Sequence, residues 1–339
     1  MTQKRTLLQK IPVDGFSIAI LAMVLVATLF PASGIVAVAL DYATDLGIAL
    51  LFFLYGARLS REDIVGGMMH WRLHLVVLAS TYVLFPILVL AMRPLLVDIV
   101  DDRVLIGVLF LATLPSTVQS SIAFTSIAGG NVAAAICAAS LSSLLGVFLT
   151  PALVGMLIDM EGSMDFVTSA SKIMAQILLP FVIGHLMRPL IGAWVTKNKP
   201  WLTYVDRGAI VLIVYVAFSA SVQEGLWREV PWTAFLAAFL ISSALLALVL
   251  VLTRTIARAL RFERADEITT VFCGSKKSLA AGMPMAKVLF AGVPSIGMII
   301  FPLMLFHQIQ LMVCAVIAAR YAQSAPSDEP DEPATSVAG

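Results

Sequence analysis

The sequence predicts an all-α membrane protein of ten transmembrane helices, arranged as a five-plus-five inverted repeat. Three observations lead to this prediction. Hydrophobic residues occupy 60% of the 339 positions and charged residues 13%, whereas soluble domains average roughly 45–50% apolar and 25% charged residues. The apolar residues form long continuous stretches, as in membrane helices, and not the alternating strands of an outer-membrane barrel. Several features of the first half also recur in the second half at one fixed offset.

Ten apolar stretches are long enough to cross a bilayer, whose core of about 30 Å takes about 20 helical residues. They cover residues 14–30, 41–57, 72–92, 104–127, 131–158, 168–190, 204–222, 231–256, 266–290 and 293–319. The first stretch has the basic start of a signal peptide, but it lacks a clear small-residue cleavage site. We therefore interpret it as a retained first span.

The distribution of basic residues predicts that both termini are cytoplasmic. With the N-terminus inside, 15 of the 22 Lys and Arg residues fall in cytoplasmic segments and five in outer loops, which is the bias of proteins in the cell (inner or plasma) membrane. The chain then divides into a basic cytoplasmic N-terminus (1–13), a first repeat (14–158), an extracytoplasmic linker (159–167), a second repeat (168–320) and a disordered acidic tail (321–339).

Charge and cysteine content exclude several functions. The formal net charge is +1, and no basic face of the kind that binds nucleic acid is present. Cys137, Cys273 and Cys314 lie in apolar stretches and form no CxxC pair, so we expect small buried side chains. We predict no nucleic-acid partner and no cofactor other than a coupling ion, with the lipid bilayer as the surroundings.

An internal repeat sets the predicted architecture. An offset of 161 residues pairs DLG (45–47) with DRG (206–208), the turn AGGN (128–131) with AGVPS (291–295), and Pro115 with Lys276. Each match is weak alone, but one offset serves all three. Because each copy holds five helices, the second copy must enter the membrane in the opposite orientation.

Two stretches contain residues that interrupt a helix at corresponding points. The fourth contains LPSTVQSSIAF (114–124), and the ninth contains CGSKKSLAAGMP (273–284). Pro115 removes a backbone donor and Gly274 loosens its segment, so we predict that both helices are discontinuous. Paired interrupted helices in two inverted halves indicate a binding site near the membrane midplane.

Two adjacent lysines give the strongest single signal for that site. A charge at the centre of a span costs about 2.5–3.5 kcal/mol, so Lys276 and Lys277 imply a water-filled cavity or an anionic partner. The alternative is that they extend to an interface or cap a helix end. The candidate substrate- or ion-binding residues are Lys276, Lys277, Ser275, Ser278, Ser116, Thr117, Gln119, Ser120, Ser121 and Asn131.

The hydroxyl residues also have a structural interpretation. Ser and Thr in membrane helices often bond to the preceding turn or pack between helices, so the cluster 116–121 serves equally well for packing. Asn131, Ser140, Ser142 and Ser143 are better explained by packing and capping than by ligand binding.

These motifs resemble the bile acid:sodium symporter family, and more closely its SBF-like branch. The resemblance covers about 14–320 and is most specific in LPSTVQSSIAFTSIAGGN (114–131), CGSKKSLAAGMP (273–284) and FHQIQLMVCAVIAARYA (306–322). It implies a core domain of spans 3–5 and 8–10, in which spans 4 and 9 cross at their interruptions, and a panel domain of spans 1, 2, 6 and 7. It also implies sodium-coupled uptake of organic anions by alternating access between the two domains.

The chain departs from the sodium-coupled pattern that this resemblance implies. The family pattern has a glutamate near 271–273, where this chain has no acid, and a Ser-Asn pair where Ser120 and Ser121 stand. Two hydroxyl ligands would fall at Ala135 and Ala139, which supply none. The residues left for a sodium site are Ser120, Ser121 and Ser140.

Two further interpretations of the lysines therefore stay open. A fixed ammonium on Lys276 or Lys277 could take the electrostatic place of sodium and hold the carboxylate, sulfate or phosphate of a substrate without a coupling ion. A buried lysine could instead exchange its proton and couple transport to protons. The predicted function is secondary transport of a small organic anion, with a sodium-independent or proton-coupled carrier as the alternative.

Three other classes compete with this prediction. A membrane enzyme would need reactive groups, but His70 and His74, beside Trp71, fit an interfacial anchor better than a metal site, and no HExxH motif occurs. We therefore predict no enzymatic activity. A cation/proton antiporter would need a carboxylate at mid-membrane, whereas Asp45 and Asp206 begin helices. A solute sensor that binds without transporting would keep the fold but show no flux.

Overall fold

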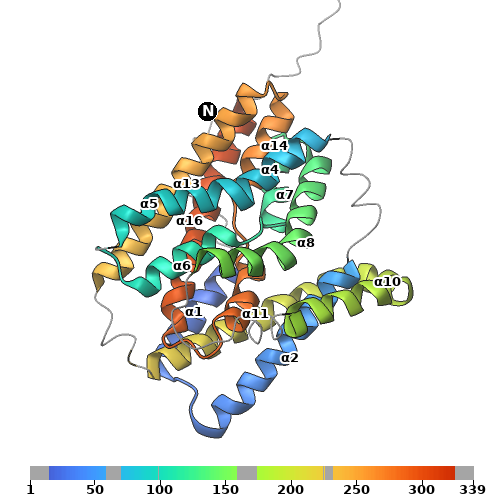
Figure 1. The fold of residues 1–339 in the computed structure, drawn as a ribbon. Helices are drawn as coiled ribbons and strands as arrows, with labels where there is room; N and C mark the ends of the chain where they lie inside the picture. The colour runs from blue at the N-terminus through green and yellow to red at the C-terminus, as the bar shows by residue number, and fades with distance from the viewer. Residues whose placement is uncertain are drawn as a thin grey trace, which may run out of the picture.

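The computed structural model describes residues 15–58, 70–97, 99–158, 174–223, 225 and 232–324. Nearly all of these residues are helical and none forms a strand (Figure 1), which confirms the all-α prediction. The basic N-terminus (1–13), the linker (159–167) and most of the tail (321–339) lie outside the described residues.

Helices occupy every apolar stretch that the sequence analysis marks. In the first half they are α1 (Gly15–Leu29), α2 (Gly34–Arg58), α4 (Trp71–Ala79), the π-helical turn η3 (Ser80–Leu84), α5 (Phe85–Leu96), α6 (Asp102–Thr113), α7 (Gln119–Ile127) and α8 (Val132–Leu157). In the second half they are the π-helical turn η4 (Met174–Leu178), α10 (Leu179–Lys197), α11 (Lys199–Gln223), α13 (Trp232–Ala259), α14 (Arg264–Gly274), α15 (Leu279–Leu289) and α16 (Ile296–Gln323).

Seven helical segments of the described chain are long and apolar enough to cross a membrane. Three of the ten predicted stretches are not among them: 14–30 contains only the shorter apolar helix Ile18–Leu29, and 104–127 and 266–290 are each divided into two shorter helices at the predicted interruption. The sixth stretch is longer than its apolar run suggests: α10 continues to Lys197. Arg188 lies within this helix, as it does within the predicted stretch 168–190.

Two groups of helices pack against each other. In one group, α2 lies along α10 with extensive contact, and α11 packs against α1 and α2 (Figure 1). In the other, α6 packs against α16 and α5, and α14 packs against α13, α7, α4 and α8. Contacts of α11 with α15 and α16 join the two groups.

Small residues permit the closest of these contacts. A Cβ atom on Gly56 of α2 would lie 1.9 Å from the carbonyl oxygen of Phe181, and one on Gly184 of α10 would lie 1.9 Å from the carbonyl oxygen of Phe53. Neither distance is physically accessible, so only glycine fits. Close approach of backbones through glycine is a common way for membrane helices to associate.

Candidate functional site

The two helix interruptions contact one another through backbone and hydroxyl groups. The backbone N–H of Ser278 donates to the carbonyl oxygen of Pro115 at 2.9 Å. The hydroxyl of Ser116 donates to the carbonyl oxygen of Cys273 at 2.6 Å, and the hydroxyl of Ser121 donates to that of Phe272 at 3.2 Å. The segment between α6 and α7 thus lies against the segment between α14 and α15, and each satisfies polar groups of the other.

Lys277 is completely buried at this contact. Its ammonium nitrogen donates to the carbonyl oxygens of Thr81 at 2.7 Å, Ala112 at 2.8 Å and Leu114 at 2.7 Å. It also lies 4.1 Å from the centre of the Phe85 ring, a favourable cation–π distance. An ammonium has three protons to donate, so every proton of Lys277 has a backbone acceptor.

The sequence explains why these carbonyls are available. Pro115 has no N–H, and the N–H of Ser116 donates to the hydroxyl of Ser142 at 3.0 Å, so the last turn of α6 lacks its usual helical donors. Thr81 lies in the π-helical turn, where the N–H of Phe85 donates to Ser80 and the next residue, Pro86, has no N–H. Lys277 therefore satisfies carbonyls that have lost their helical donors: that of Thr81 before Pro86, that of Ala112 because the N–H of Ser116 turns to Ser142, and that of Leu114 because the helix is interrupted there.

The backbone around Lys277 is fixed by a residue that the sequence analysis did not select. Its N–H donates to the side-chain oxygen of Gln310 at 2.9 Å, and the amide of Gln310 donates back to its carbonyl oxygen at 2.9 Å. Gln310 also contacts the ring nitrogen Nδ1 of His307 at 3.0 Å. The only sequence signal for this role is the polar cluster at 307–310 inside an otherwise apolar stretch.

Lys276 points to different surroundings. It is also completely buried, but its ammonium donates to the carbonyl oxygen of Ser120 at 2.8 Å and lies 4.0 Å from the ring centre of Phe124 and 5.2 Å from that of Phe272. Two aromatic faces and one carbonyl thus surround this charge. The two consecutive lysines therefore place their ammonium groups in two different environments.

Carboxylates do not pair with either lysine within the described part of the chain. Glu267, on the same helix as the interruption, is paired with Arg254 and Arg258 at 3.2 and 3.1 Å. The described residues also contain no group of three or more His, Cys, Asp or Glu side chains that could hold a metal ion. Carbonyl dipoles and aromatic faces replace a counter-ion at the interruption.

The other candidate residues divide between the interruption and elsewhere. Thr117 contacts the hydroxyls of Ser120 at 2.7 Å and Ser121 at 3.0 Å, next to Lys276. The remaining hydroxyls of the second interruption are local: Ser275 donates to the carbonyl oxygen of Val271 at 2.6 Å, and Ser278 caps α15 by accepting from the N–H of Ala281 at 3.2 Å.

Three candidate residues lie outside this network. Asn131 caps α8 by accepting from the N–H of Ala134 at 3.0 Å and donates to Asp266 at 3.0 Å. Gln119 is exposed at the start of α7, and Ser140 is half-buried on α8. The structure thus brings together the hydroxyls at 116, 117, 120, 121, 275 and 278 with the two lysines, and places Asn131 at a helix end.

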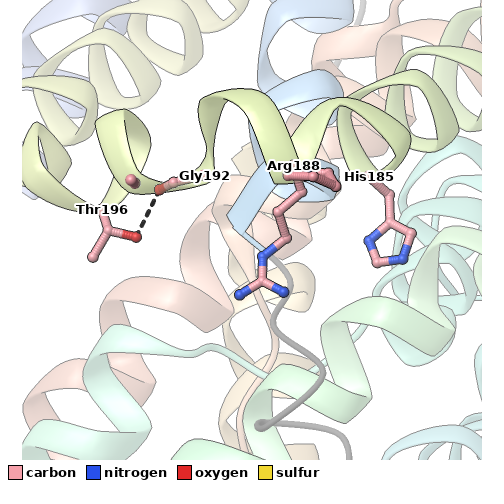
Figure 2. Close-up of a pocket in the computed structure, with 6 residues that line it drawn as sticks. His185, Arg188, Gly192 and Thr196 are labelled. Carbon is pink, nitrogen blue, oxygen red and sulfur yellow. Dashed lines mark hydrogen bonds between the residues drawn. The ribbon is translucent and has the colours of Figure 1, made fainter.

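A cavity on α10 is lined by a cationic side chain, that of Arg188, which the sequence analysis did not select. It has a volume of about 490 Å³ and is lined by His185, Arg188, Pro189, Gly192, Ala193 and Thr196. Figure 2 shows the side chains of Arg188 and His185 pointing away from α10 on the same side. The predicted stretch 168–190 contains the first half of this lining face, but the residues from Gly192 to Thr196 lie beyond its end, so the sequence shows only part of the helical spacing.

Comparison with known proteins identifies the family. Residues 14–323 match the SBF-like CPA transporter family. The chain belongs to this family. Its relatives include an uncharacterized protein of Pseudomonas aeruginosa, 58% identical over 91% of this chain and 93% of that protein, and the "Putative symporter YfeH" of Escherichia coli, 53% identical over 91% and 92%. "Sodium/bile acid cotransporter 7" of Rattus norvegicus is 28% identical over 92% and 93%.

Family membership confirms the resemblance found in the sequence. The protein is a multi-pass membrane transporter of the SBF-like and bile acid:sodium symporter group. Because the family consists of transporters, an enzymatic role has no support from it.

Proposed function

We propose that this SBF-like transporter is a secondary carrier that moves a small organic anion across the cell membrane by alternating access. Ten membrane helices in two inverted repeats, with both termini cytoplasmic, would form the core and panel domains between which the solute passes. The observation that carries the proposal is the pair of interrupted helices that meet at residues 114–118 and 275–278. Interrupted helices of this kind expose backbone dipoles to a solute or ion in many transporters.

The hydrogen bonds at the interruptions support the inverted repeat. Ser116 donates through its side chain to the carbonyl of Cys273, and Lys277 donates through its side chain to the carbonyl of Ala112. Both donors and both acceptors are related by the offset of 161 residues found in the sequence. Each donor also gives its N–H to a side chain of the next long helix, Ser142 for Ser116 and Gln310 for Lys277.

We further propose that the ammonium of Lys277 takes the place of a coupling cation. Three carbonyl oxygens at 2.7–2.8 Å surround it, which is an all-oxygen environment of the sort that a bound alkali cation needs. The residues left for a sodium site are few, since Ser121 already bonds to Phe272 and Thr117. The carrier would then need no sodium, although a relative's name includes sodium.

Sodium-dependent stability tests this proposal without a known substrate. A ligand that binds only the folded state raises the melting temperature in proportion to RT ln(1 + [L]/Kd). We expect the purified wild-type protein to melt at the same temperature in sodium chloride and in choline chloride at fixed ionic strength. A sodium-specific rise that grows with the logarithm of the sodium concentration would contradict the proposal and restore sodium coupling.

Removing the tethered cation gives the complementary experiment. In Lys277→Ala, the carbonyls of Thr81, Ala112 and Leu114 would face a space from which the ammonium is missing. We expect this variant, unlike the wild type, to gain a sodium-dependent rise in melting temperature. Lys276→Ala is the matched control, because its ammonium contacts only one carbonyl; an equal sodium response in both variants would contradict the specific role of Lys277.

Proton coupling is the second candidate, and Lys276 is the residue that favours it. Its ammonium has one carbonyl acceptor and two aromatic neighbours, so losing a proton would cost it fewer hydrogen bonds than Lys277. In proteoliposomes, a proton-coupled carrier would acidify or alkalinise the lumen when a transported anion is added. Lys276→Gln would abolish this signal, and a signal that persists in the variant would eliminate Lys276 as the coupling group.

A further inference from the structure

The cavity on α10 has the features of a binding site that the interruptions lack. The lysines at the interruptions are buried and engaged with carbonyls or rings, whereas Arg188 and His185 project into a space of about 490 Å³ (Figure 2). Both side chains are partly exposed. A solute can therefore reach them without disrupting the core.

The residues of α10 divide into three faces along the helix. At 3.6 residues per turn, Phe181, Gly184 and Val195 share a buried face, which packs on α2. A second face is exposed and apolar, as a lipid-facing surface would be; it contains Leu186, Leu190 and Trp194. A third face, which adjoins the buried one and shares Arg188 with its edge, lines the cavity with residues 185, 188, 189, 192 and 196. The polar side chains in the interior of α10 lie on this third face.

Arg188 has no partner among the described residues. No hydrogen bond or ion pair joins its guanidinium to another residue of the described chain, and α10 is one of the segments long and apolar enough to span the membrane. A charge in a membrane helix is costly unless it faces water, a partner or a ligand. The position of Arg188 in the cavity explains how the helix tolerates its charge, and its guanidinium donors are available to a ligand.

The local sequence keeps the guanidinium extended into the cavity. A Cβ atom on Gly192 would lie 3.0 Å from the Cγ atom of Arg188, so glycine leaves room for the arginine stem along the helix. Pro189 has no N–H, which leaves the carbonyl of His185 without its usual helical donor. The Nδ1 atom of His185 is itself buried without a hydrogen-bond partner in the described chain.

We propose that Arg188 and His185 bind the oxyanion group, a carboxylate, sulfate or phosphate, of a soluble solute. The guanidinium offers two parallel donors that match the geometry of such a group, and the imidazole, one turn earlier on the same face, supplies a third donor. Thr196 does not take part, since its hydroxyl donates to the carbonyl of Gly192 at 2.9 Å. This inference rests on the proposed function and names the chemistry of its substrate.

Melting temperatures of the full-length protein in phosphatidylcholine nanodiscs test the site. The probes are potassium phosphate, potassium sulfate and potassium succinate, each balanced with potassium chloride to constant ionic strength. We expect at least one probe to raise the wild-type melting temperature, with the logarithm of its concentration once that exceeds Kd. We expect Arg188→Gln to weaken its apparent affinity about tenfold to a hundredfold, the size expected for losing a hydrogen bond to a charged group. Absence of such a concentration-dependent shift with all three probes would overturn the proposal.

Lys197→Gln is the matched control. Lys197 carries the same charge on the same helix, is exposed, and does not line the cavity, so we expect wild-type affinity. Equal losses in Lys197→Gln and Arg188→Gln would mean unspecific attraction and overturn the site. His185→Asn should weaken binding less than Arg188→Gln, and Gly192→Leu should abolish it by displacing the arginine stem. Unchanged affinity in Gly192→Leu would contradict the geometry.

Two further experiments show whether the oxyanion belongs to a lipid or to a soluble solute, and whether the site takes part in transport. If phosphatidylglycerol in the nanodisc stabilises the wild type but not Arg188→Gln, while no soluble probe does, the cavity holds a lipid head group and the proposal fails. Flux of the bound probe into proteoliposomes distinguishes the two proposals. If binding requires Arg188 but no flux is seen, the binding site is supported and the proposed transport is contradicted. If flux is equal in the wild type and in Arg188→Gln, transport is supported and the proposed binding site is contradicted.

Discussion

The ammonium nitrogen of Lys277 lies 2.7 Å from the carbonyl oxygen of Leu114, so a side chain from one helix interruption completes the hydrogen bonding of the other. The remaining orphan carbonyls of α6 are also satisfied: Thr150 donates to the carbonyl of Thr113 at 2.8 Å, and Lys277 donates to that of Ala112. Nothing at the end of α6 is left without a donor. The two interruptions therefore stabilise each other, and neither is stable in an apolar environment alone.

Lys277→Met should strongly destabilise the protein. Methionine matches the length of the aliphatic chain but leaves three buried carbonyls without donors, and an unsatisfied buried polar group costs about 1–3 kcal/mol. We expect a clear fall in melting temperature in detergent. Lys199→Met, at an exposed position at the start of α11, is the control; a Lys277→Met protein as stable as this control would refute the role assigned to the ammonium.

Lys276→Met should cost less than Lys277→Met. The substitution removes one hydrogen bond, to the carbonyl of Ser120, and the contacts of the ammonium with the rings of Phe124 and Phe272. A desolvated cation–π contact is worth about 2 kcal/mol. A double-mutant cycle with Phe124→Leu should show that the two substitutions are not additive. Additive losses in melting temperature would mean that the ring does not stabilise the ammonium.

The sequence predicts the interruptions because their cause is local. Pro115 cannot donate a backbone hydrogen bond and Gly274 favours a break, so both positions are visible in the sequence. The partners of Lys277 are not visible, since the carbonyl of Thr81 becomes available only through the π-helical turn before Pro86. Which carbonyls lie free depends on backbone geometry that residue types do not specify.

The cavity is not predictable from the sequence for a different physical reason. The predicted sixth stretch ends at 190, whereas α10 continues to Lys197, so Gly192 and Thr196 of the cavity lie beyond the predicted end. The helical spacing of His185, Arg188 and Gly192 is present in the sequence, but whether that face meets lipid, protein or space depends on how α10 packs against α2. That packing is set by the tertiary contacts at Gly56 and Gly184.

Gly184→Ala should disrupt the packing of α2 on α10. The added Cβ atom would lie 1.9 Å from the carbonyl oxygen of Phe53, and a rigid backbone atom cannot move away cheaply. Gly208→Ala on α11 is the control, because nothing lies within 4 Å of its added Cβ atom; alanine there should be neutral or stabilising by about 0.5–1 kcal/mol. Similar melting temperatures for the two variants would show that the helices do not approach as closely as described.

Two ion pairs that involve α2 should differ in strength because they differ in burial. Lys287 bonds to Asp45 at 2.9 Å, and the side chain of Asp45 is 45% exposed; Arg58 bonds to Asp206 at 2.5 Å, and the side chain of Asp206 is 12% exposed. Exposed pairs contribute about 0–1 kcal/mol, whereas removing one partner of a buried pair costs about 3–5 kcal/mol.

Asp206→Asn should therefore lower the melting temperature far more than Asp45→Asn. In the first variant the charge of Arg58 loses its partner while its Nε and Nη2 atoms are already buried without hydrogen-bond partners. In the second, Lys287 still bonds to Asp41 at 2.9 Å. Raising the salt concentration should abolish the small effect of Asp45→Asn, since screening acts on exposed charges, and leave most of the effect of Asp206→Asn. Equal sensitivity of both variants to salt would show that the Arg58–Asp206 pair is as open to water as the Lys287–Asp45 pair.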